Sequence, residues 1–376
     1  MTRVSVKPLA RSGAELRRFL QVSHEIYRGD PHWVAPLRSD AEKLLSNRNP
    51  FFEHAEMQLW IAGRDGRDLG RIAGIVDRRF NEFHRNATAS FGFFECVNEP
   101  AVSAALFAAA LDWARSRGLK RIIGPLNPST NEECGLLTLG FESPPVFMMS
   151  YNPPYYVGFL EAAGFTKAKD LLAFAFDLAN APNGRFERFA ERFKEREPGI
   201  TINPVTRRTL SAVLADVKEV YNAAWEANWG FVPMTDGEIE FLAARLKPLL
   251  TAGLAYLARN VHEPVGFLLA LPDFNEPFKA LKGRWLSPAL PGFLPYLFGW
   301  RMPRACRVVA LGVKAKYRGR GIESAMLAQG LRAGFALGFR SVEASWILED
   351  NLPARRVIEL FGGEPYKAYR IYERLV

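Results

Sequence analysis

The sequence predicts an α/β (α+β) fold made of two tandem domains of one kind. At about 150 residues per domain, a chain of 376 residues has room for two, and an apolar content of 48% is enough to give each a core. Strand and helix patterns alternate, and their order in residues 200–376 repeats their order in residues 1–178. Residues 159–164 and 357–362 support this repeat, because each reads as a helix that ends at a glycine before a strand.

The first half predicts eight elements from hydrophobic spacing and turn residues. In order, they are a strand at 4–7, a helix at 14–27, a hairpin at 58–76, a strand at 89–97, a helix at 101–117, a strand at 121–125, a helix at 155–164 and a strand at 171–178. The hairpin turns at Asp65 and Gly66, while Pro100 begins and Gly118 ends the helix at 101–117. This half is the predicted N-terminal domain, 1–178.

Residues 179–199 are polar, contain Pro182, Gly184 and Pro198, and predict a linker helix between the domains. The pattern then restarts in the predicted C-terminal domain, 200–376. Its expected elements are a strand at 200–204, helices at 210–225 and 236–246, a hairpin at 254–271, a strand at 307–313, a helix at 322–337, a strand at 341–348, a helix at 352–361 and a strand at 366–374.

Composition argues against several classes of protein. No run of about eighteen uncharged apolar residues occurs, and the first residues lack a secretory apolar stretch, so we expect a cytoplasmic location. Three cysteines without CxxC spacing and five histidines argue against a disulfide framework or a metal site. The net charge is +9, and residues 301–376 hold 14 Lys and Arg against 7 Asp and Glu, which favours an anionic ligand without identifying it.

The most informative segment is the predicted strand 307–313, its glycine-containing loop and the helix that follows. Gly319 and Gly321 let the backbone turn tightly and approach a ligand, and the helix begins directly after them. The free N–H groups and positive dipole end of a helix attract anions. The segment therefore predicts a pyrophosphate cradle.

This segment resembles the GNAT superfamily, whose signature is Arg or Gln, two residues, Gly, one residue, and Gly or Ala. Arg318, Gly321 and Ile322 fit the pattern, whereas Glu323 replaces its last small residue. The resemblance implies two GNAT-like domains, each with a mixed, mostly antiparallel sheet flanked by helices and a splayed parallel strand pair at the site. The cofactor implied is acetyl-CoA or a longer acyl-CoA, bound by Leu311, Val313, Arg318, Gly319, Arg320, Gly321 and Ile322.

A second GNAT pattern follows the strand 341–348. Asn351, Ala354 and Gly362 fit it, and the resemblance implies that Asn351 hydrogen-bonds the pantetheine arm. The tyrosine that this family often has on the helix is Ile358 here. Tyr366, Tyr369 and Tyr372 follow, and we take Tyr369 and Tyr372 as candidate catalytic acids.

Acyl transfer to an amine also needs a proton acceptor and an acceptor site. Glu349 and Asp350 are the candidate bases, and the backbone N–H groups around Val313 are candidate oxyanion donors. The first half lacks a glycine-rich loop, so we expect no CoA site there. Its polar loops, with one tryptophan of the second half, supply the candidate substrate residues Asn127, Asn131, Glu132, Tyr155, Tyr156 and Trp229.

The whole chain resembles a group of bacterial tandem-GNAT acyltransferase-like proteins, some of which act on sphingoid amino lipids. We therefore predict an acyl-CoA-dependent N-acyltransferase, with a small-molecule or lipid amine as acceptor. Long-chain transfer to an amino lipid, a non-enzymatic CoA-binding module and a nucleic-acid-binding protein are the alternatives, the last without a supporting motif. The apolar insert 283–300 braces the domains, covers a lipid-like substrate or contacts the inner face of the membrane.

Overall fold

The computed structural model describes residues 3–178 and 183–376 and divides the chain into two compact units. The N-terminal unit comprises Met1–Leu171, Lys282–Trp285 and Lys367–Val376, and the C-terminal unit comprises Leu172–Leu281 and Leu286–Tyr366. The last strand of the chain thus belongs mostly to the N-terminal unit. The domain bounds expected from sequence, 1–178 and 200–376, stay a prediction.

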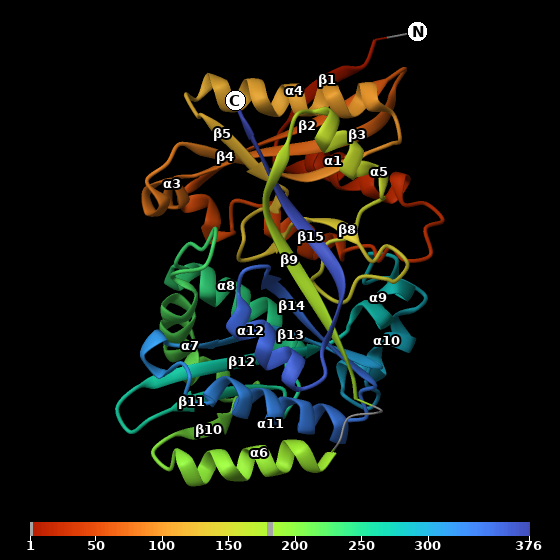
Figure 1. Ribbon diagram of the computed structural model, residues 1–376. Helices are drawn as coiled ribbons and strands as arrows, with labels where there is room; N and C mark the ends of the chain where they lie inside the picture. The colour runs from red at the N-terminus through yellow and green to blue at the C-terminus, as the bar shows by residue number, and fades with distance from the viewer. Residues whose placement is uncertain (1–2, 179–182) are drawn as a thin grey trace. The chain divides into compact units, whose positions relative to one another are not determined.

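The N-terminal unit has a mixed sheet with the strand order β1-β2-β3-β4-β5-β15, in which only β4 and β5 pair in parallel (Figure 1). Its elements are β1 (Ser5–Leu9), α1 (Gly13–Ile26), α2 (Arg38–Leu45), β2 (Ala55–Arg64), β3 (Arg67–Asp77), α3 (Arg78–His84), β4 (Thr88–Cys96), α4 (Pro100–Ser116), β5 (Arg121–Gly124), β6 (Leu126–Asn127), β7 (Glu133–Cys134), β8 (Leu136–Leu139), α5 (Tyr155–Ala162) and the start of β9 (Thr166–Asp177).

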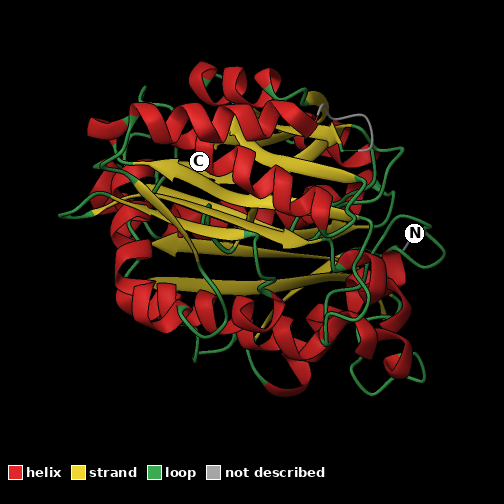
Figure 2. Cartoon of the chain, turned by 90° about the horizontal axis from the view of Figure 1, so that it is seen from below, coloured by secondary structure: helices red, strands yellow, loops and turns green. Residues whose placement is uncertain are grey.

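The C-terminal unit has the strand order β9-β14-β13-β12-β11-β10, and β13 and β14 form its parallel pair (Figure 2, strands in yellow). Its remaining elements are α6 (Asn183–Arg196), β10 (Thr201–Pro204), α7 (Leu210–Trp225), α8 (Asp236–Leu246), β11 (Ala255–Arg259), β12 (Pro264–Pro272), α9 (Asn275–Leu281), α10 (Leu290–Leu297), β13 (Ala305–Val313), α11 (Ile322–Ala336), β14 (Ser341–Leu348), α12 (Leu352–Leu360) and the start of β15 (Glu364–Leu375).

The α/β class predicted from the sequence is confirmed, and every predicted element is present with bounds shifted by a few residues. Sequence reasoning missed the short helices α2, α3 and α9, and it assigned no helix within the proline-containing insert, where α10 forms. The predicted linker contains α6, while its residues 179–182 lie outside the described part of the chain. The three cysteines are buried thiols, as expected for small apolar residues.

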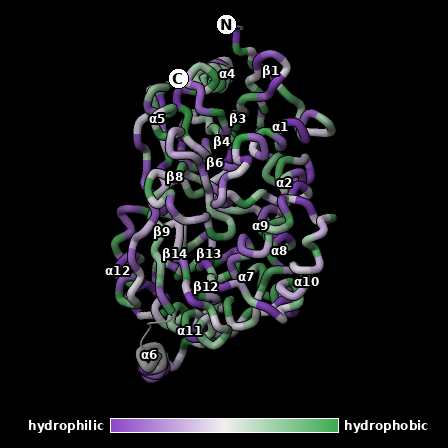
Figure 3. Tube along the Cα trace, turned by 90° about the vertical axis from the view of Figure 1, so that its right-hand side faces the viewer, coloured by the Kyte–Doolittle hydropathy of each residue, from purple (hydrophilic) through white to green (hydrophobic). Residues whose placement is uncertain are grey.

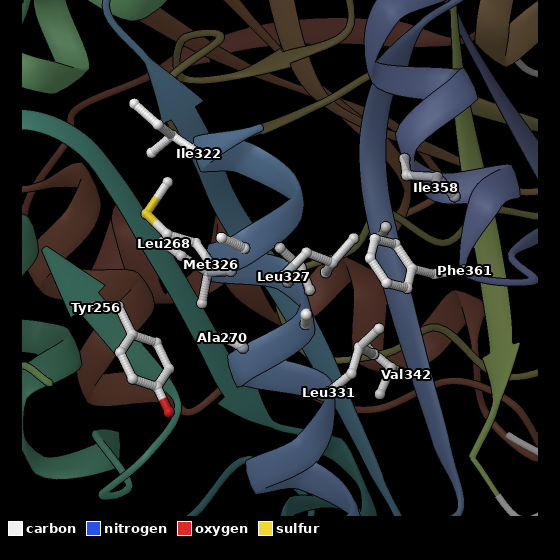
Figure 4. Packing of buried hydrophobic residues seen from close by; sticks show 14 of the residues in the cluster. Tyr256, Leu268, Ala270, Ile322, Met326, Leu327, Leu331, Val342, Ile358 and Phe361 are labelled. Atoms are coloured by element: carbon white, nitrogen blue, oxygen red, sulfur yellow. The ribbon is translucent and has the colours of Figure 1, made fainter. Parts of the chain in front are cut away.

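Helix α11 is the element that positions the predicted cradle, because its apolar face anchors it to the sheet. Ile322 and Met326 are fully buried, and α11 packs over β12 and β13, with Leu268 and Val342 in the same buried cluster (Figure 4). Burial of each large apolar side chain contributes about 1.5–3 kcal/mol. The helix N-terminus is therefore held at a fixed place beside the strand ends. Figure 3 shows the alternation of hydrophobic and hydrophilic stretches along the chain.

None of the helices in the ranges that the structure describes is long and apolar enough to cross a bilayer.

Candidate active site

The parallel strands β13 and β14 separate at the middle of the C-terminal sheet. They are in register from Ala305 and Ser341 to Val308 and Ala344, and their pairing ends there although β13 continues to Val313. A bulge marks the point of separation, because Leu269 of β12 pairs with Ala310 and the next residue, Ala270, pairs with Val308. Residues 309–312 are only partly buried although β13 is a central strand. The edge of β13 is consequently open beyond the bulge.

Two backbone N–H groups of β13 point into this opening. Lys314 donates its N–H to the Val265 carbonyl of β12, at 2.9 Å. Successive residues of a strand direct their N–H groups to opposite edges, so those of Val313 and Leu311 point away from β12. Such fixed donors can stabilise negative charge on the oxygen of a thioester carbonyl.

The loop after β13 has the backbone geometry of an anion site. Gly319 and Gly321 have φ angles of +76° and +84°, a region that glycine adopts without strain. Gly321 is the N-cap of α11 and has no side chain to cap the helix. Apart from the N–H of Glu323, which interacts with the carboxylate of the same residue, the first N–H groups of α11 can bind a ligand. This geometry agrees with the tight, anion-binding turn that we expect from the positions of Gly319 and Gly321 in the sequence.

The two loop arginines are held by the protein itself. Arg318 donates to the carbonyl oxygens of Val313, at 3.2 Å, and Ala224, at 2.5 Å. Arg320 forms an ion pair with Glu197, with its Nε at 3.1 Å from the carboxylate. Arg318 therefore fixes the loop against the end of β13, and neither guanidinium is an isolated positive charge.

A group of ion pairs supports the same junction. Lys314 is 6% exposed and donates to Glu219 and, at 2.9 Å, to Glu263. Hydrogen bonds from Lys316, Lys314 and the Tyr317 hydroxyl lower the pKa of Glu263 to about 2. Glu263 therefore stays ionised at any physiological pH and accepts hydrogen bonds from three residues of the strand-to-loop connection.

Glu323, which departs from the GNAT pattern, lies in the first turn of α11. Burial raises the pKa of its carboxyl group, and its own backbone N–H and Arg318 only partly oppose that shift. An acidic group with a raised pKa thus lies next to the helix end that we assign to pyrophosphate.

The predicted residues after β14 occupy the turn that leads into α12. Asn351 caps α12 by accepting the Ala354 N–H at 3.2 Å, and Glu349 accepts a 3.3 Å hydrogen bond from Arg355 through its backbone carbonyl. Glu349 is partly buried and Asp350 is exposed. Asn351 has a structural role in this turn, and both carboxylates lie where β14 ends.

Sequence reasoning missed a buried polar group on the parallel pair. Arg307 and Glu343 are 2% and 3% exposed, and Ser345 connects them with hydrogen bonds of 3.0 Å from Arg307 and 2.6 Å to Glu343. Tyr366 donates its hydroxyl to the second oxygen of Glu343. The sequence did contain a signal for this group. Each of the two largely apolar strands holds one charged residue, Arg307 or Glu343, and buried charges occur almost only in pairs.

Comparison with known proteins identifies the family. The family model "Acetyltransferase (GNAT) family" matches residues 214–362. "Bacterial ceramide synthase" of Caulobacter vibrioides is 35% identical over 99% of this chain and 97% of its own length, and "Protein YghO" of Escherichia coli K12 is 33% identical over 96% and 93%. The chain belongs to the GNAT superfamily, in its bacterial tandem-GNAT acyltransferase group.

The fold of a solved tandem GNAT protein agrees with this membership. A tandem GNAT protein from the clavulanic acid biosynthesis pathway has a TM-score of 0.60 and covers 99% of this chain and 98% of its own, at 15% identity. As a GNAT enzyme, the protein is an acyl-CoA-dependent N-acyltransferase, with acyl-CoA as co-substrate and an amine as acceptor. Across the described ranges no cluster of three or more metal-ligating side chains occurs.

In the N-terminal GNAT unit, the chain itself fills the place of the opening. β4 and β5 pair in parallel only from Thr88 and Arg121 to Ser90 and Ile123, and the segment after β5 lies against β4. Asn127, a predicted substrate residue, accepts the Phe93 N–H at 2.6 Å. A Cβ atom at Gly92 would be 1.8 Å from the Leu126 carbonyl oxygen, so strand and segment are in direct contact.

Other predicted substrate residues of this unit make internal hydrogen bonds. Tyr156 is fully buried, donates to Glu95 at 2.9 Å and accepts the Cys96 N–H at 2.7 Å. Tyr155 donates to the Cys96 carbonyl at 2.9 Å, and burial raises its pKa to about 12. Asn131 and Glu132 are partly buried in the loop between β6 and β7.

The remaining predicted residues are divided between the units. Trp229 is partly buried between α7 and α8 of the C-terminal unit. Tyr369 and Tyr372 lie on β15 in the N-terminal unit, at 0% and 1% exposure, and burial raises the pKa of Tyr372. Tyr366 is partly exposed and is the tyrosine of this group that belongs to the C-terminal unit.

Proposed function

We propose that the enzyme transfers a long-chain acyl group from acyl-CoA to the amine of a sphingoid base, in the cytoplasm. The observation that carries this proposal is the 35% identity to a bacterial ceramide synthase over almost the full length of both chains. A ceramide is an N-acylated sphingoid base, so the named product fits the N-acyl transfer that this family performs.

The proposed reaction divides the C-terminal site into a phosphate end and a reaction end. The N–H groups at the start of α11, after Gly319 and Gly321, hold the pyrophosphate of CoA. The pantetheine arm follows the open edge of β13, and the thioester oxygen accepts from the N–H groups of Leu311 and Val313. The amine nitrogen attacks the carbonyl carbon, the C–S bond breaks, and an amide and the CoA thiolate result.

Two protons must move in this reaction. The attacking amine loses one, for which we propose Glu349 or Asp350 as acceptor, directly or through water, because both lie where β14 ends. The thiolate gains one. For this role we propose Tyr366 ahead of Tyr369 and Tyr372, because it belongs to the same unit as the opened strands and is partly exposed.

A matrix of donors and acceptors tests the proposed substrates. Purified protein receives palmitoyl-CoA or acetyl-CoA together with sphinganine, octadecylamine or a lysine-containing peptide, and mass spectrometry identifies the acylated products. We expect N-palmitoyl-sphinganine as the main product. Preferential acetylation of the peptide would contradict the proposal and favour a small acetyl acceptor.

The catalytic assignments need a separate comparison. Glu349→Gln, Asp350→Asn and Tyr366→Phe are measured beside Tyr369→Phe and Tyr372→Phe at saturating donor. We expect the largest losses of kcat among Glu349→Gln, Asp350→Asn and Tyr366→Phe. Loss of a true acid or base should lower kcat on the order of 10²-fold or more. If kcat falls only in Tyr369→Phe or Tyr372→Phe, that tyrosine, and not Tyr366, is the acid that protonates the thiolate.

A further inference from the structure

The insert between β12 and β13 carries large apolar side chains that are exposed to solvent. Leu286 is 95% exposed, Phe298 is 60% exposed and Trp300 is 80% exposed. The rings of Phe298 and Trp300 stack at a centroid distance of 5.2 Å. An aromatic pair on a protein surface is costly to keep in water, which indicates that something covers it.

The helix that presents this pair is firmly attached to its unit. α10 lies beside α9, as Figure 1 shows, and the Phe293 and Phe278 rings stack between them at a centroid distance of 5.2 Å. Phe293 and Tyr296 are 1% and 8% exposed. One face of α10 is therefore buried within its unit, and the exposed aromatic pair lies at and just after the end of the helix.

The charged side chains of the segment that carries the pair have a single sign. Residues 286–322 of the C-terminal unit contain no Asp or Glu, and the part before β13 contributes Arg301 and Arg304. Arg301 and Arg304 are exposed, and the Arg301 guanidinium lies 5.0 Å from the centre of the Tyr296 ring. The preceding acidic residue, Glu276, accepts the backbone N–H of Arg304 at 2.8 Å.

We propose that residues 286–304, the aromatic-basic segment, dock the enzyme onto an anionic lipid bilayer. Trp and Phe side chains insert at the level of the headgroups, and Arg side chains bind the lipid phosphates from above. The charge decides for this partner, because the charged side chains of the segment itself are all cationic and complement an anionic surface. Docking does not depend on the identity of the acyl acceptor.

Vesicle binding tests the docking. The full-length protein is sedimented with vesicles of phosphatidylcholine alone or mixed with phosphatidylglycerol, and the bound fraction is measured against lipid concentration. Three forms are compared: wild type, Phe298→Ser with Trp300→Ser, and Arg301→Gln with Arg304→Gln. Val261→Ser with Phe335→Ser and Arg340→Gln with Arg356→Gln are the matched controls, since these residues are also exposed.

We expect wild type to bind only the anionic vesicles. Loss of both arginine charges should weaken the partition coefficient by roughly 30-fold, about fivefold for each charge near the surface. The serine pair should weaken it at least as much, and brominated lipids should quench the tryptophan fluorescence of wild type more than that of Trp300→Ser. Both control pairs should bind like wild type.

Three results would overturn the proposal: equal binding to neutral vesicles, test variants that bind like their controls, or a dimer of the wild type that the serine pair dissolves. The third would make the segment an interface between two copies. Circular dichroism confirms that each variant is folded. Activity on sphinganine dispersed in detergent separates the two proposals, because a docking variant should keep that activity and a wrong substrate would leave every form inactive.

Discussion

Glu323 sets the charge at the start of α11, where the family pattern has a small residue. Its carboxyl group is close to the N–H groups that we assign to the pyrophosphate, and burial raises its pKa. A neutral carboxyl group tolerates a phosphate beside it, whereas the ionised form repels it. The affinity for CoA should therefore depend on the protonation of this residue.

We predict that the affinity for CoA falls as pH rises through the raised pKa of Glu323 and is constant above it. The sign follows from the ionised form being the repulsive one. Glu323→Gln should bind CoA more tightly at pH 8 by about 1 kcal/mol, roughly fivefold in Kd, and lose this pH dependence. Calorimetry from pH 5 to pH 8 measures it, with Glu359→Gln on α12 as control. An unchanged profile in Glu323→Gln would contradict the prediction.

Gly321 offers a test of the cradle with an internal control. Its φ of +84° is matched by the φ of +83° at Gly338, beyond the other end of α11, and a Cβ atom has space at both positions. Valine at either position should therefore cost about 1–2 kcal/mol of stability. Of the two positions, Gly321 lies at the helix end that we assign to the phosphate and Gly338 lies at the opposite end.

We predict that Gly321→Val weakens CoA binding by on the order of tenfold to hundredfold, the value of one or two charge-assisted hydrogen bonds. Gly338→Val should bind CoA like wild type. Calorimetry of the two folded variants decides, and equal affinity in both would refute the assigned phosphate site.

At the scale of elements, the divergence of β13 and β14 creates the site, and the buried pair Arg307 and Glu343 lies where the two strands are still in register. The sequence predicted both strands, the loop and α11, because hydrophobic spacing and glycine position are local signals. It did not predict the polar group, because pairing Arg307 with Glu343 requires the register of two strands that are separated along the chain.

We predict that Glu343→Leu lowers the free energy of unfolding by about 3–5 kcal/mol, because it leaves the Arg307 guanidinium buried without its carboxylate. Adding Arg307→Met should recover most of this loss, since no charge then remains buried. Urea unfolding monitored by circular dichroism measures both. A double variant as unstable as the single one would show that the pair itself, and not the orphaned charge, matters.

At the scale of the whole molecule, the two GNAT units differ at corresponding places. In the C-terminal unit the parallel strands are open beyond Val308, whereas in the N-terminal unit the segment through Leu126 and Asn127 lies against β4. The absence of a glycine-rich loop in the first half already pointed to this difference. The structure adds the physical reason: the edge of β4 is covered by the chain itself, which could not be predicted from the sequence.

We predict one CoA site per chain, because only the C-terminal unit has both the open strand edge and the glycine loop. Calorimetric titration with CoA should therefore give a stoichiometry of one, and Gly321→Val should leave no second site of comparable affinity. A stoichiometry of two would show that the N-terminal unit opens and binds CoA.

The most direct test of the central claim is the release of free CoA thiol from palmitoyl-CoA, measured with and without sphinganine, together with the mass of the lipid product. The account predicts release that requires sphinganine, yields N-palmitoyl-sphinganine in equal amount and is lost in Gly321→Val but kept in Gly338→Val. Release without an amine, or a product acylated on oxygen, would contradict it.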